Sequence, residues 1–530
     1  MDTQQPISAN RQIARAAGTV MAAFILSNLF GLVRNILVLR AFGTSMELDS
    51  FNAANRVAEL LFNLMAGGAL GSAFIPTFTG LLAKEDQPLA WRLASSVANL
   101  LLVTLSAVGL LAAIFAPQIV RYGLFLLDPG ANPYQEVLTV LLLRVLMPSI
   151  IVFGISGLVM GVLNAHQVFL VPAAAPAMYS LGIIIGVTLY PAEWGILRLA
   201  YGALTGALLH LLVQLPNLVR LGGRYTLSLG LRNPLVGEVA RLMGPRVFGV
   251  AVVQLNFIVN TIIALSLPEG SISAITLAFS LMLMPQMAIA QSIAIAAMPT
   301  FSRQVATGRL VEMRASLAAS LRMVLLLALP AAAGLILLRT PVITLLFTGS
   351  SSAFDERSVQ LVAWALLWYG LGLVGHSVVE IVSRAFFALH DTRTPVMVGV
   401  AGMTLNIVFS LLFSSWFARL GWMPHGGLAL SSSLATFLEM LALLYLLRRR
   451  LQGLEGMSIA RAVMKSALAA GGMGAALWFW LAQFGGIPVV VQVAGGLVTG
   501  ILVYGLLVVL LRVPEVRQGV MLVRSRLKPW

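Results

Sequence analysis

Residues Ala73–Ala83 read AFIPTFTGLLA and residues Ala296–Ala306 read AAMPTFSRQVA, so one motif occurs twice at a spacing of 223 residues. The first alanine, Pro-Thr-Phe, a hydroxyl residue and the last alanine keep their positions in both copies. A second match lies upstream, where VRNI at Val33–Ile36 corresponds to VNTI at Val259–Ile262, 226 positions further on. Internal repeats are typical of membrane transporters. The chain is therefore predicted to contain two related halves.

The composition indicates an all-α polytopic membrane protein. Hydrophobic residues make up 59% of the 530 residues and charged residues only 10%, whereas a soluble domain carries about 25% charged residues. Apolar stretches of about 20 residues, each long enough to cross ~30 Å of hydrocarbon as a helix, follow one another along the chain. Fourteen transmembrane helices are predicted, centred on residues 18–40, 52–80, 93–116, 137–162, 168–190, 197–219, 243–264, 273–298, 319–338, 359–386, 396–416, 427–447, 462–483 and 488–511.

The matched segments suggest how these spans are grouped. Span one pairs with span seven and span two with span eight, so six spans separate the copies and both halves have the same orientation. We expect an N-terminal six-helix lobe over 1–222, a C-terminal six-helix lobe over 223–450, and an appended pair of helices with a basic tail over 451–530. The loop Arg220–Arg246 is the expected joint between the lobes, and alternating access would follow from rocking one lobe against the other.

The basic residues predict the orientation. With the N-terminus in the cytoplasm, 25 of the 34 Lys and Arg residues fall on cytoplasmic ends and loops, as the positive-inside rule requires. Both termini are then cytoplasmic. The net charge of +15 reflects this topology and contact with anionic lipid rather than nucleic-acid binding. The absence of cysteine excludes disulfides and thiolate chemistry.

Charged residues inside predicted spans are candidate functional groups, because they are expensive in a bilayer. The N-terminal half holds three such cations, Arg34, Arg56 and Arg144, together with Asp49 and Glu59. Arg56 and Glu59 are three apart and can pair on one helical face, and Asp49 is placed to orient Arg34. Guanidinium groups facing a cavity suit an anionic head group. The alternative is that these arginines reach the membrane interface or form structural ion pairs.

The C-terminal half is poorer in charge. Glu380 and Arg384 are four apart and are expected to pair, while Glu439 lies deep in span twelve, as either a proton-coupling acid or a protonated core residue. No Gly-rich phosphate loop, catalytic triad or HExxH pattern is present in the sequence. We therefore predict no enzyme activity, no metal site and no cofactor.

Several motifs carry a resemblance to a known family. They are FGLVRNILVLRAFG (Phe30–Gly43), DSF (Asp49–Phe51), GALGSAFIPTF (Gly68–Phe78), LLRVLMPSIIVFGISGLVMGVLNA (Leu142–Ala165), RAFFALHDTRTPV (Arg384–Val396) and GLALSSSLA (Gly427–Ala435). With these motifs, nearly the whole chain resembles the MurJ (MviN) lipid II flippase family of the multidrug/oligosaccharidyl-lipid/polysaccharide exporter superfamily. RAFFALHDTRTPV is the most specific of them.

The resemblance implies fourteen helices, with two lobes around a central cavity and a final pair that forms a groove for a lipid tail. It implies a flippase that moves the undecaprenyl-diphosphate-linked peptidoglycan precursor across the bacterial cytoplasmic membrane, acting as a monomer. Arginines of the cavity would contact the diphosphate and sugars. By position, Arg34, Asp49, Arg56 and Arg144 match polar or basic positions of the family and are the predicted substrate-binding residues.

The chain also departs from the family pattern, as a divergent member. The arginine pair usual on span two is Phe62 and Asn63, the acid that follows it is Gly67, and the arginine usual on span eight is Ser280. Lost cations together with lost acids suit a changed site, because removing one partner strands the other. Two alternatives to lipid II transport follow: transport of another polyprenyl-linked glycan, and a transport-inactive scaffold that binds lipid or partner proteins.

The resemblance also bears on ion coupling. Members with a sodium site carry acids at the positions of Asn260 and Ser410, beside Asn406. Both acids are replaced by neutral residues here, so sodium coupling is not expected.

Overall fold

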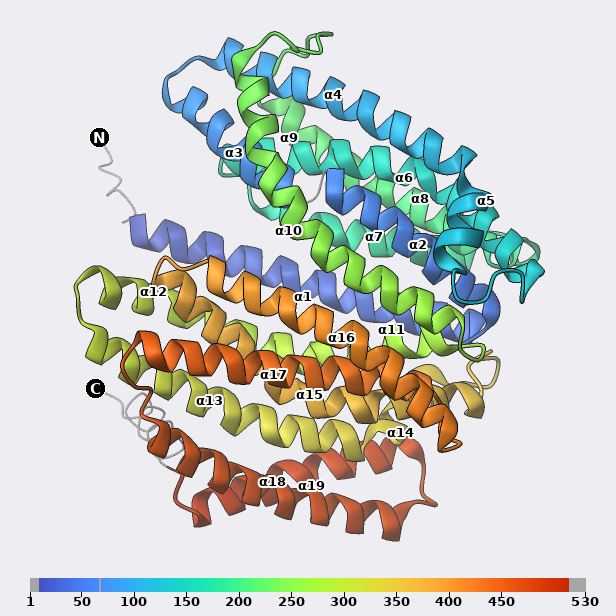
Figure 1. The fold of residues 1–530 in the computed structure, drawn as a ribbon, viewed down its shortest axis with the longest axis vertical. Helices are drawn as coiled ribbons and strands as arrows, with labels where there is room; N and C mark the ends of the chain where they lie inside the picture. Colours follow the sequence, from blue (N-terminus) through green and yellow to red (C-terminus); the bar gives the residue numbers. More distant parts are fainter. Residues whose placement is uncertain (1–8, 66–67, 514–530) are drawn as a thin grey trace, which may run out of the picture. The chain divides into compact units, whose positions relative to one another are not determined.

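The computed structural model describes residues 9–65 and 68–513, and each regular element in this part of the chain is helical (Figure 1). The predicted all-α fold is therefore confirmed. Two features named above, Gly67 on span two and the basic tail after residue 513, lie outside the described residues.

The chain forms two compact units, Met1–Glu269 with Ser351–Ala353, and Gly270–Ser350 with Phe354–Trp530. The helices of the first unit are α1 (Ala9–Phe42), α2 (Met46–Met65), α3 (Gly68–Ala83), α4 (Gln87–Ile114), α5 (Ala116–Ile119), α6 (Pro133–Ala165), α7 (Leu170–Leu189), α8 (Leu197–Leu212), α9 (Leu215–Arg220) and α10 (Pro234–Leu265), with a π turn η1 (Val120–Leu124) and a 3-10 turn η2 (Ala192–Trp194). Those of the second unit are α11 (Ser271–Gln286), α12 (Ser292–Ala306), α13 (Leu310–Leu337), α14 (Arg339–Phe347), α15 (Glu356–Ala388), α16 (Arg393–Arg419), α17 (His425–Arg450), α18 (Gly456–Phe484) and α19 (Val489–Leu510), with a π turn η3 (Met287–Gln291).

The helices coincide with the predicted spans. Within the described residues, 11 helical segments are long and apolar enough to cross a membrane. They correspond to predicted spans three to six and eight to fourteen. The other three predicted spans coincide with α1, with α2 and α3 together, and with α10. All fourteen predicted spans are thus helical in the residues that the structure describes.

The two halves repeat the same packing. In the first unit α6 packs against α2 and α4, and α7 packs against α8. The corresponding helices of the second unit make the same pairs, because α15 packs against α11 and α13, and α16 packs against α17. The repeat seen in the sequence is therefore a repeat of helix packing.

Span eight is interrupted by a π turn. This turn, Met287–Gln291, separates α11 from α12. Short π segments inside helices mark departures from regular hydrogen bonding and are frequent at functional sites.

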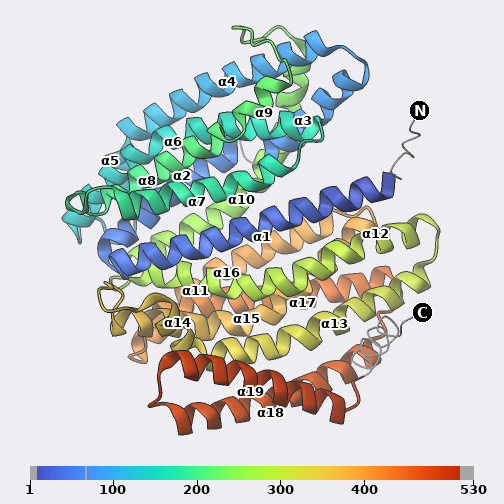
Figure 2. The ribbon, with the colours of Figure 1, turned by 180° about the vertical axis from the view of Figure 1, so that it is seen from behind.

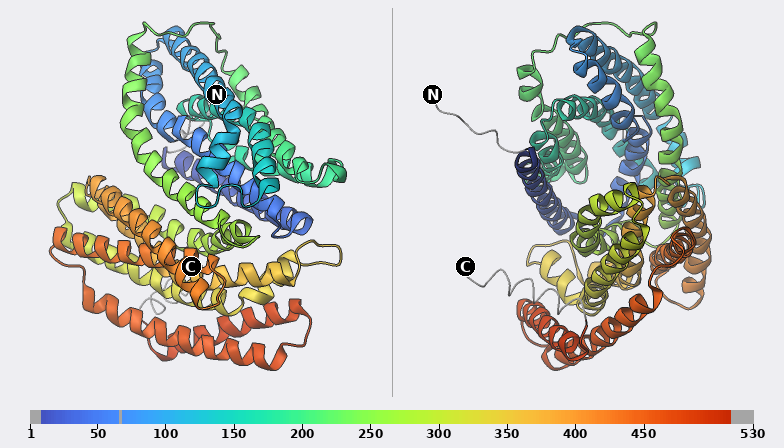
Figure 3. Two further views of the ribbon diagram at one scale, coloured as in Figure 1. Left: turned by 45° about the vertical axis from the view of Figure 1, so that its right-hand side comes forward. Right: turned by 90° about the vertical axis from the view of Figure 1, so that its left-hand side faces the viewer.

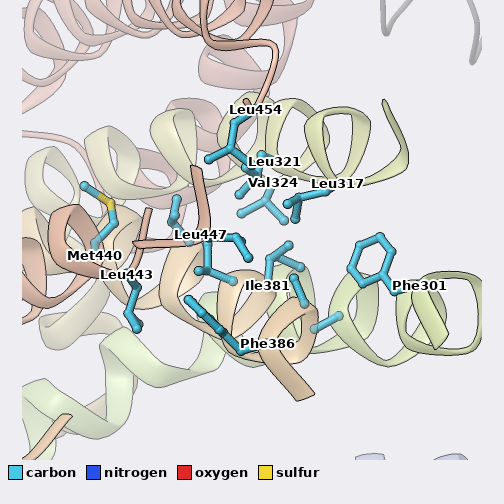
Figure 4. Close-up of a cluster of buried hydrophobic side chains, with 14 of the residues drawn as sticks. Phe301, Leu317, Leu321, Val324, Ile381, Phe386, Met440, Leu443, Leu447 and Leu454 are labelled. Atoms are coloured by element: carbon cyan, nitrogen blue, oxygen red, sulfur yellow. The ribbon is translucent and has the colours of Figure 1, made fainter. Parts of the chain in front are cut away.

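The Pro-Thr-Phe motif supplies a buried anchor in each half. Phe78 and Phe301 both have 0% exposure. Phe301 belongs to a hydrophobic cluster built from α12, α13, α15 and α17, where it lies with Leu317, Ile381 and Phe386 (Figure 4). Because lipid tails are as apolar as leucine, helices in a membrane associate through packing of this kind rather than through the hydrophobic effect. The motif thus places a fully buried phenylalanine in each half.

The contact between α7 and α8 depends on glycine. Gly182 and Gly186 of α7 face Gly202 and Gly206 of α8, in two G-x-x-x-G patterns. A Cβ atom on Gly182 would lie 2.1 Å from the Cα atom of Gly206. The two backbones therefore approach more closely than any larger residue would permit.

The linker after α9 belongs entirely to the first unit, together with α10, which packs against α2 and α3. The boundary between the compact units falls later, between Glu269 and Gly270, where Gly270 has a φ of +88°. The predicted joint Arg220–Arg246 concerns the sequence repeat, which this boundary does not test. The lobes 1–222, 223–450 and 451–530 remain a prediction about the repeat.

The appended pair packs on the second unit. Helix α18 lies along α13, and α19 lies beside α18 in each view (Figures 2 and 3). The hydroxyl of Tyr504 donates a hydrogen bond to the Leu326 carbonyl at 2.5 Å. At the start of α18, Arg322 forms an ion pair with Glu455 at 3.6 Å and donates to the Ser458 hydroxyl at 3.0 Å. Both helices of the appended pair are thus held to α13 by polar contacts.

Candidate functional site

Helix α2 carries a polar stripe through a membrane-spanning segment. Asp49, Arg56, Glu59 and Asn63 recur at spacings of seven, three and four residues, which places them on one helical face. Lipid cannot form hydrogen bonds with the polar side chains of such a face. The face must therefore contact protein or a water-filled cavity.

A cavity of about 450 Å³ lies against this stripe. Four helices of the first unit build it: α2, α6, α7 and α10. The lining residues are Asn55, Arg56, Ala58, Glu59, Phe62, Asn63, Ser149, Ile150, Phe153, Tyr179, Gln254 and Phe257. One arginine, one carboxylate and several amide and hydroxyl groups thus converge on an otherwise apolar pocket, which is the composition of a ligand site.

Arg56 is held in the cavity from two sides. Its Nη1 lies 2.8 Å from Oε2 of Glu59, and its guanidinium carbon lies 5.0 Å from the centroid of the Phe257 ring. The predicted Arg56–Glu59 pair is therefore confirmed. The other carboxylate oxygen of Glu59 accepts a hydrogen bond from Asn55 Nδ2 at 3.0 Å. Most of the N–H donors of the guanidinium have no partner among the described residues, so they are available to a ligand.

Arg34 lies close to the cavity without lining it. It is half-buried on α1, which packs against α7 (Figure 2). Its Nη2 and Nε donate to Oδ1 of Asn35 at 3.0 and 3.2 Å. Tyr179, on the cavity wall, lies within electrostatic range of both Arg34 and Glu59. Arg34 therefore contributes positive potential at the α7 side of the cavity.

Asp49 does not line this cavity. It is buried, with 3% exposure, and lines a second cavity of about 230 Å³. The other polar side chains of that cavity include Asp128, Asn132, Gln135 and Glu269. Asp49 and Arg56 are two helical turns apart, or ~10 Å along the axis, and they line different cavities. The Asp49–Arg34 interaction stays a prediction.

Arg144 lies on an exposed face of α6. Its Nε donates a hydrogen bond to the carbonyl of Ala113, in the last turn of α4, at 3.0 Å. The described part of the chain therefore joins Arg56 and Glu59 in one cavity with Arg34 nearby, and leaves Asp49 and Arg144 outside it.

The sequence reasoning missed most of the cavity wall, including Tyr179, Gln254 and Phe257. Gln254 and Phe257 lie just before the VNTI segment that matches VRNI of span one. The sequence showed their place in the repeat. It did not show their contact with α2, which arises because α10 packs onto the first unit.

The second unit is nearly neutral at the corresponding positions. Arg384 pairs with Glu380 at 2.9 Å, as predicted. Ser280 bonds to the Thr276 carbonyl of its own helix at 2.9 Å, and Ser410 and Asn406 both approach the Ser431 hydroxyl, at 2.7 and 3.4 Å. Ser280 is thus satisfied within α11, while Ser410 and Asn406 contact the neighbouring helix α17.

No group of three or more His, Cys, Asp or Glu side chains able to hold a metal ion is found in the described residues. The carboxylate of Glu439 lies against Gly399 and Gly402 of α16. Its two possible roles, coupling acid or protonated core residue, remain open.

Comparison with known proteins gives a consistent result. The family described as "Lipid II flippase MurJ" matches residues 38–498. A protein named "Lipid II flippase MurJ" from Burkholderia cenocepacia is 32% identical over 445 residues, covering 82% of this chain and 84% of that protein.

Two solved structures share the fold. The structure titled "Lipid II flippase MurJ, inward closed conformation" superposes with a TM-score of 0.78 at 24% identity, covering 93% of this chain and 98% of that one. An inward-facing multidrug resistance MATE transporter of the MOP superfamily gives a TM-score of 0.67 at 14% identity, covering 83% and 99%. With the matched length of the family and the identity to the Burkholderia relative, the chain belongs to the MurJ family.

Proposed function

We propose that this protein is a transporter that moves lipid II, the polyprenyl-diphosphate-linked peptidoglycan precursor, across the bacterial cytoplasmic membrane. The proposal rests on membership of the MurJ family and on relatives with that name over most of their length. The observation that carries the site is Arg56, which lines a cavity of about 450 Å³ and has N–H donors without a partner in the described part of the chain. That volume lies within the ~300–1,000 Å³ of small-molecule sites. It suits a diphosphate with the adjoining sugar rather than a whole disaccharide peptide.

Glu59 gives this site two states. In the empty cavity its carboxylate neutralises Arg56, which avoids an isolated charge within a membrane-spanning segment. An entering diphosphate would compete for the same guanidinium through charge-assisted hydrogen bonds. When the lipid leaves, the Glu59 pair would form again. Phe257 would keep the guanidinium in the cavity during this exchange, because an arginine is attracted to the face of an aromatic ring.

The finer parts of the proposal follow from sequence and chemistry. Arg34 would add positive potential next to Tyr179, while direct substrate contacts by Asp49 and Arg144 would require other conformations. The distribution of basic residues supports cytoplasmic termini. We propose alternating access by a monomer as the mode of transport.

The neutral second unit favours one alternative cargo. Ser280 replaces an arginine usual in the family and bonds within its own helix. Another polyprenyl-linked glycan with fewer anionic groups would suit such a site. Competition between lipid II and a polyprenyl-linked glycan without the peptide would separate the two cargoes.

Complementation tests the proposal. The full chain is expressed in bacteria depleted of their own lipid II flippase, with Arg56→Gln as the site variant. The matched control is Arg309→Gln, because Arg309 pairs with Glu312 at the same three-residue spacing but with half-exposed side chains, at 3.5 Å. We expect the wild type and R309Q to restore growth and R56Q to fail at equal membrane level. Full rescue by R56Q would remove Arg56 from the site, and failure of the wild type would remove lipid II as cargo.

A further inference from the structure

The linker between α9 and α10 has no regular secondary structure and is held against α4 by hydrogen bonds. The Thr226 amide donates to the Ser95 hydroxyl at 3.1 Å. Asn99 Nδ2 donates to the carbonyls of Thr226 and Ser228 at 3.0 and 2.9 Å. The Tyr225 hydroxyl donates to Asn99 Oδ1. The linker beside the first turns of α4 can be followed in Figure 1. It is thus part of the first unit rather than a free tether.

These contacts explain polar residues that a membrane span would otherwise not carry. Ser95 and Asn99 are buried, with 4% and 6% exposure, and lie in the second to fourth turns of α4. The 28 residues of α4 measure ~42 Å, longer than ~30 Å of hydrocarbon. Its first turns therefore lie near the boundary between headgroups and hydrocarbon. Polar side chains there are satisfied by the linker backbone, as lipid could not do.

The opposite face of the linker is apolar. Alternate leucines of this segment are exposed. These are Leu227, Leu229 and Leu231, which are 90%, 40% and 72% exposed. A row of exposed leucines on a segment held by four hydrogen bonds marks an interaction surface.

Charge identifies the partner. Arg220, Arg224 and Arg232 are exposed at the two ends of this row, and residues 220–232 contain no acid. The segment connects two membrane helices, so it lies on one side of the bilayer. Aliphatic side chains flanked by arginines match an interface rich in anionic phospholipid, where each basic residue is attracted to the surface potential.

We propose that Tyr225–Leu231 is a lipid anchor. Its leucines insert at the boundary of an anionic leaflet, its flanking arginines bind phosphate headgroups, and its backbone is fixed to α4. This anchor ties the joint between the sequence repeats to the first unit and to the membrane. It does not depend on which lipid the protein transports.

Site-directed spin labelling tests the anchor in the full chain. Because the sequence contains no cysteine, single cysteines can be introduced as Leu227→Cys and Leu231→Cys. Gln87→Cys, at the exposed first residue of α4, is the matched aqueous control. Each labelled protein is reconstituted in vesicles of phosphatidylcholine alone or with phosphatidylglycerol. Power saturation then compares accessibility to oxygen, which partitions into lipid, and to a water-soluble nickel chelate.

In the mixed vesicles we expect labels at 227 and 231 to have an oxygen-to-nickel ratio several-fold above that at 87. Changing Arg220, Arg224 and Arg232 to Gln should bring the ratio back toward the aqueous value. The labelled positions 227, 231 and 87 are all exposed, so labelling them leaves the hydrogen bonds between the linker and α4 intact. Equal ratios at 227 and 87 in mixed vesicles would overturn the anchor. The same depth in pure phosphatidylcholine would overturn its assignment to anionic lipid.

Discussion

Replacing the aromatic ring beside Arg56 tests whether the cavity is preorganised for an anion. The guanidinium carbon lies 5.0 Å from the Phe257 centroid, and the Arg56 side chain is 26% exposed. A cation–π contact is worth ~0.5–1 kcal/mol when exposed and ~2 kcal/mol when desolvated, so we take ~1 kcal/mol for this half-buried pair. Phe257→Leu keeps an apolar side chain and removes the ring. Affinity for a polyprenyl diphosphate should then fall ~5-fold, because the arginine must be ordered on binding.

Affinity is measured with the full chain in lipid nanodiscs, by titrating a polyprenyl diphosphate and following the bound fraction by native mass spectrometry. Phe257→Trp should bind at least as well as the wild type, because tryptophan is the best cation–π partner. The double variant R56Q/F257L should bind no worse than R56Q alone, since both changes remove one interaction. If F257L weakens binding by the same factor in the R56Q background as in the wild type, the ring does not act through Arg56 and the reasoning fails.

Three further predictions concern stability. Gly182→Ala should lower the unfolding temperature, because its methyl group would meet the Gly206 backbone, whereas Gly334→Ala, with nothing within 4 Å, should not; intrinsic fluorescence in detergent checks both. Phe301→Ala should lower it more, since removing a buried phenylalanine costs ~3–5 kcal/mol; an unchanged unfolding temperature would contradict the anchoring role. Hydrogen bonds from the Thr394 amide and hydroxyl lower the pKa of Asp391, between α15 and α16. That contribution is present above the unfolded pKa of ~3.9 and disappears as the pH falls through the folded pKa, so the deficit of Asp391→Ala should shrink below about pH 4.

The fold could be predicted because its signals are local or repeated. Each apolar stretch specifies a helix by itself, and the Pro-Thr-Phe motif places a buried phenylalanine in both halves. The ion pairs Arg56–Glu59 and Arg384–Glu380 are also local, at three and four residues along one helix. These were predicted correctly.

The cavity could be predicted only in part, because tertiary packing assembles it. Tyr179 and Phe257 come from helices far from α2 in the sequence. Nothing in the sequence indicated that α10 packs against α2 and α3. Arg144 carries a charge in a predicted span, and the structure places it on an exposed face of α6 with a hydrogen bond to the α4 backbone. Charge alone therefore identified candidates without grouping them.

Transport of lipid II by the purified full-length chain is the most direct test. Vesicles are prepared with lipid II, and an impermeant reagent follows the appearance of its headgroup on the outer leaflet. The wild type and R309Q should expose the lipid at equal rates, and R56Q should remain near the rate of protein-free vesicles. A wild-type chain that binds lipid II without moving it would contradict the transport claim and identify a lipid-binding scaffold.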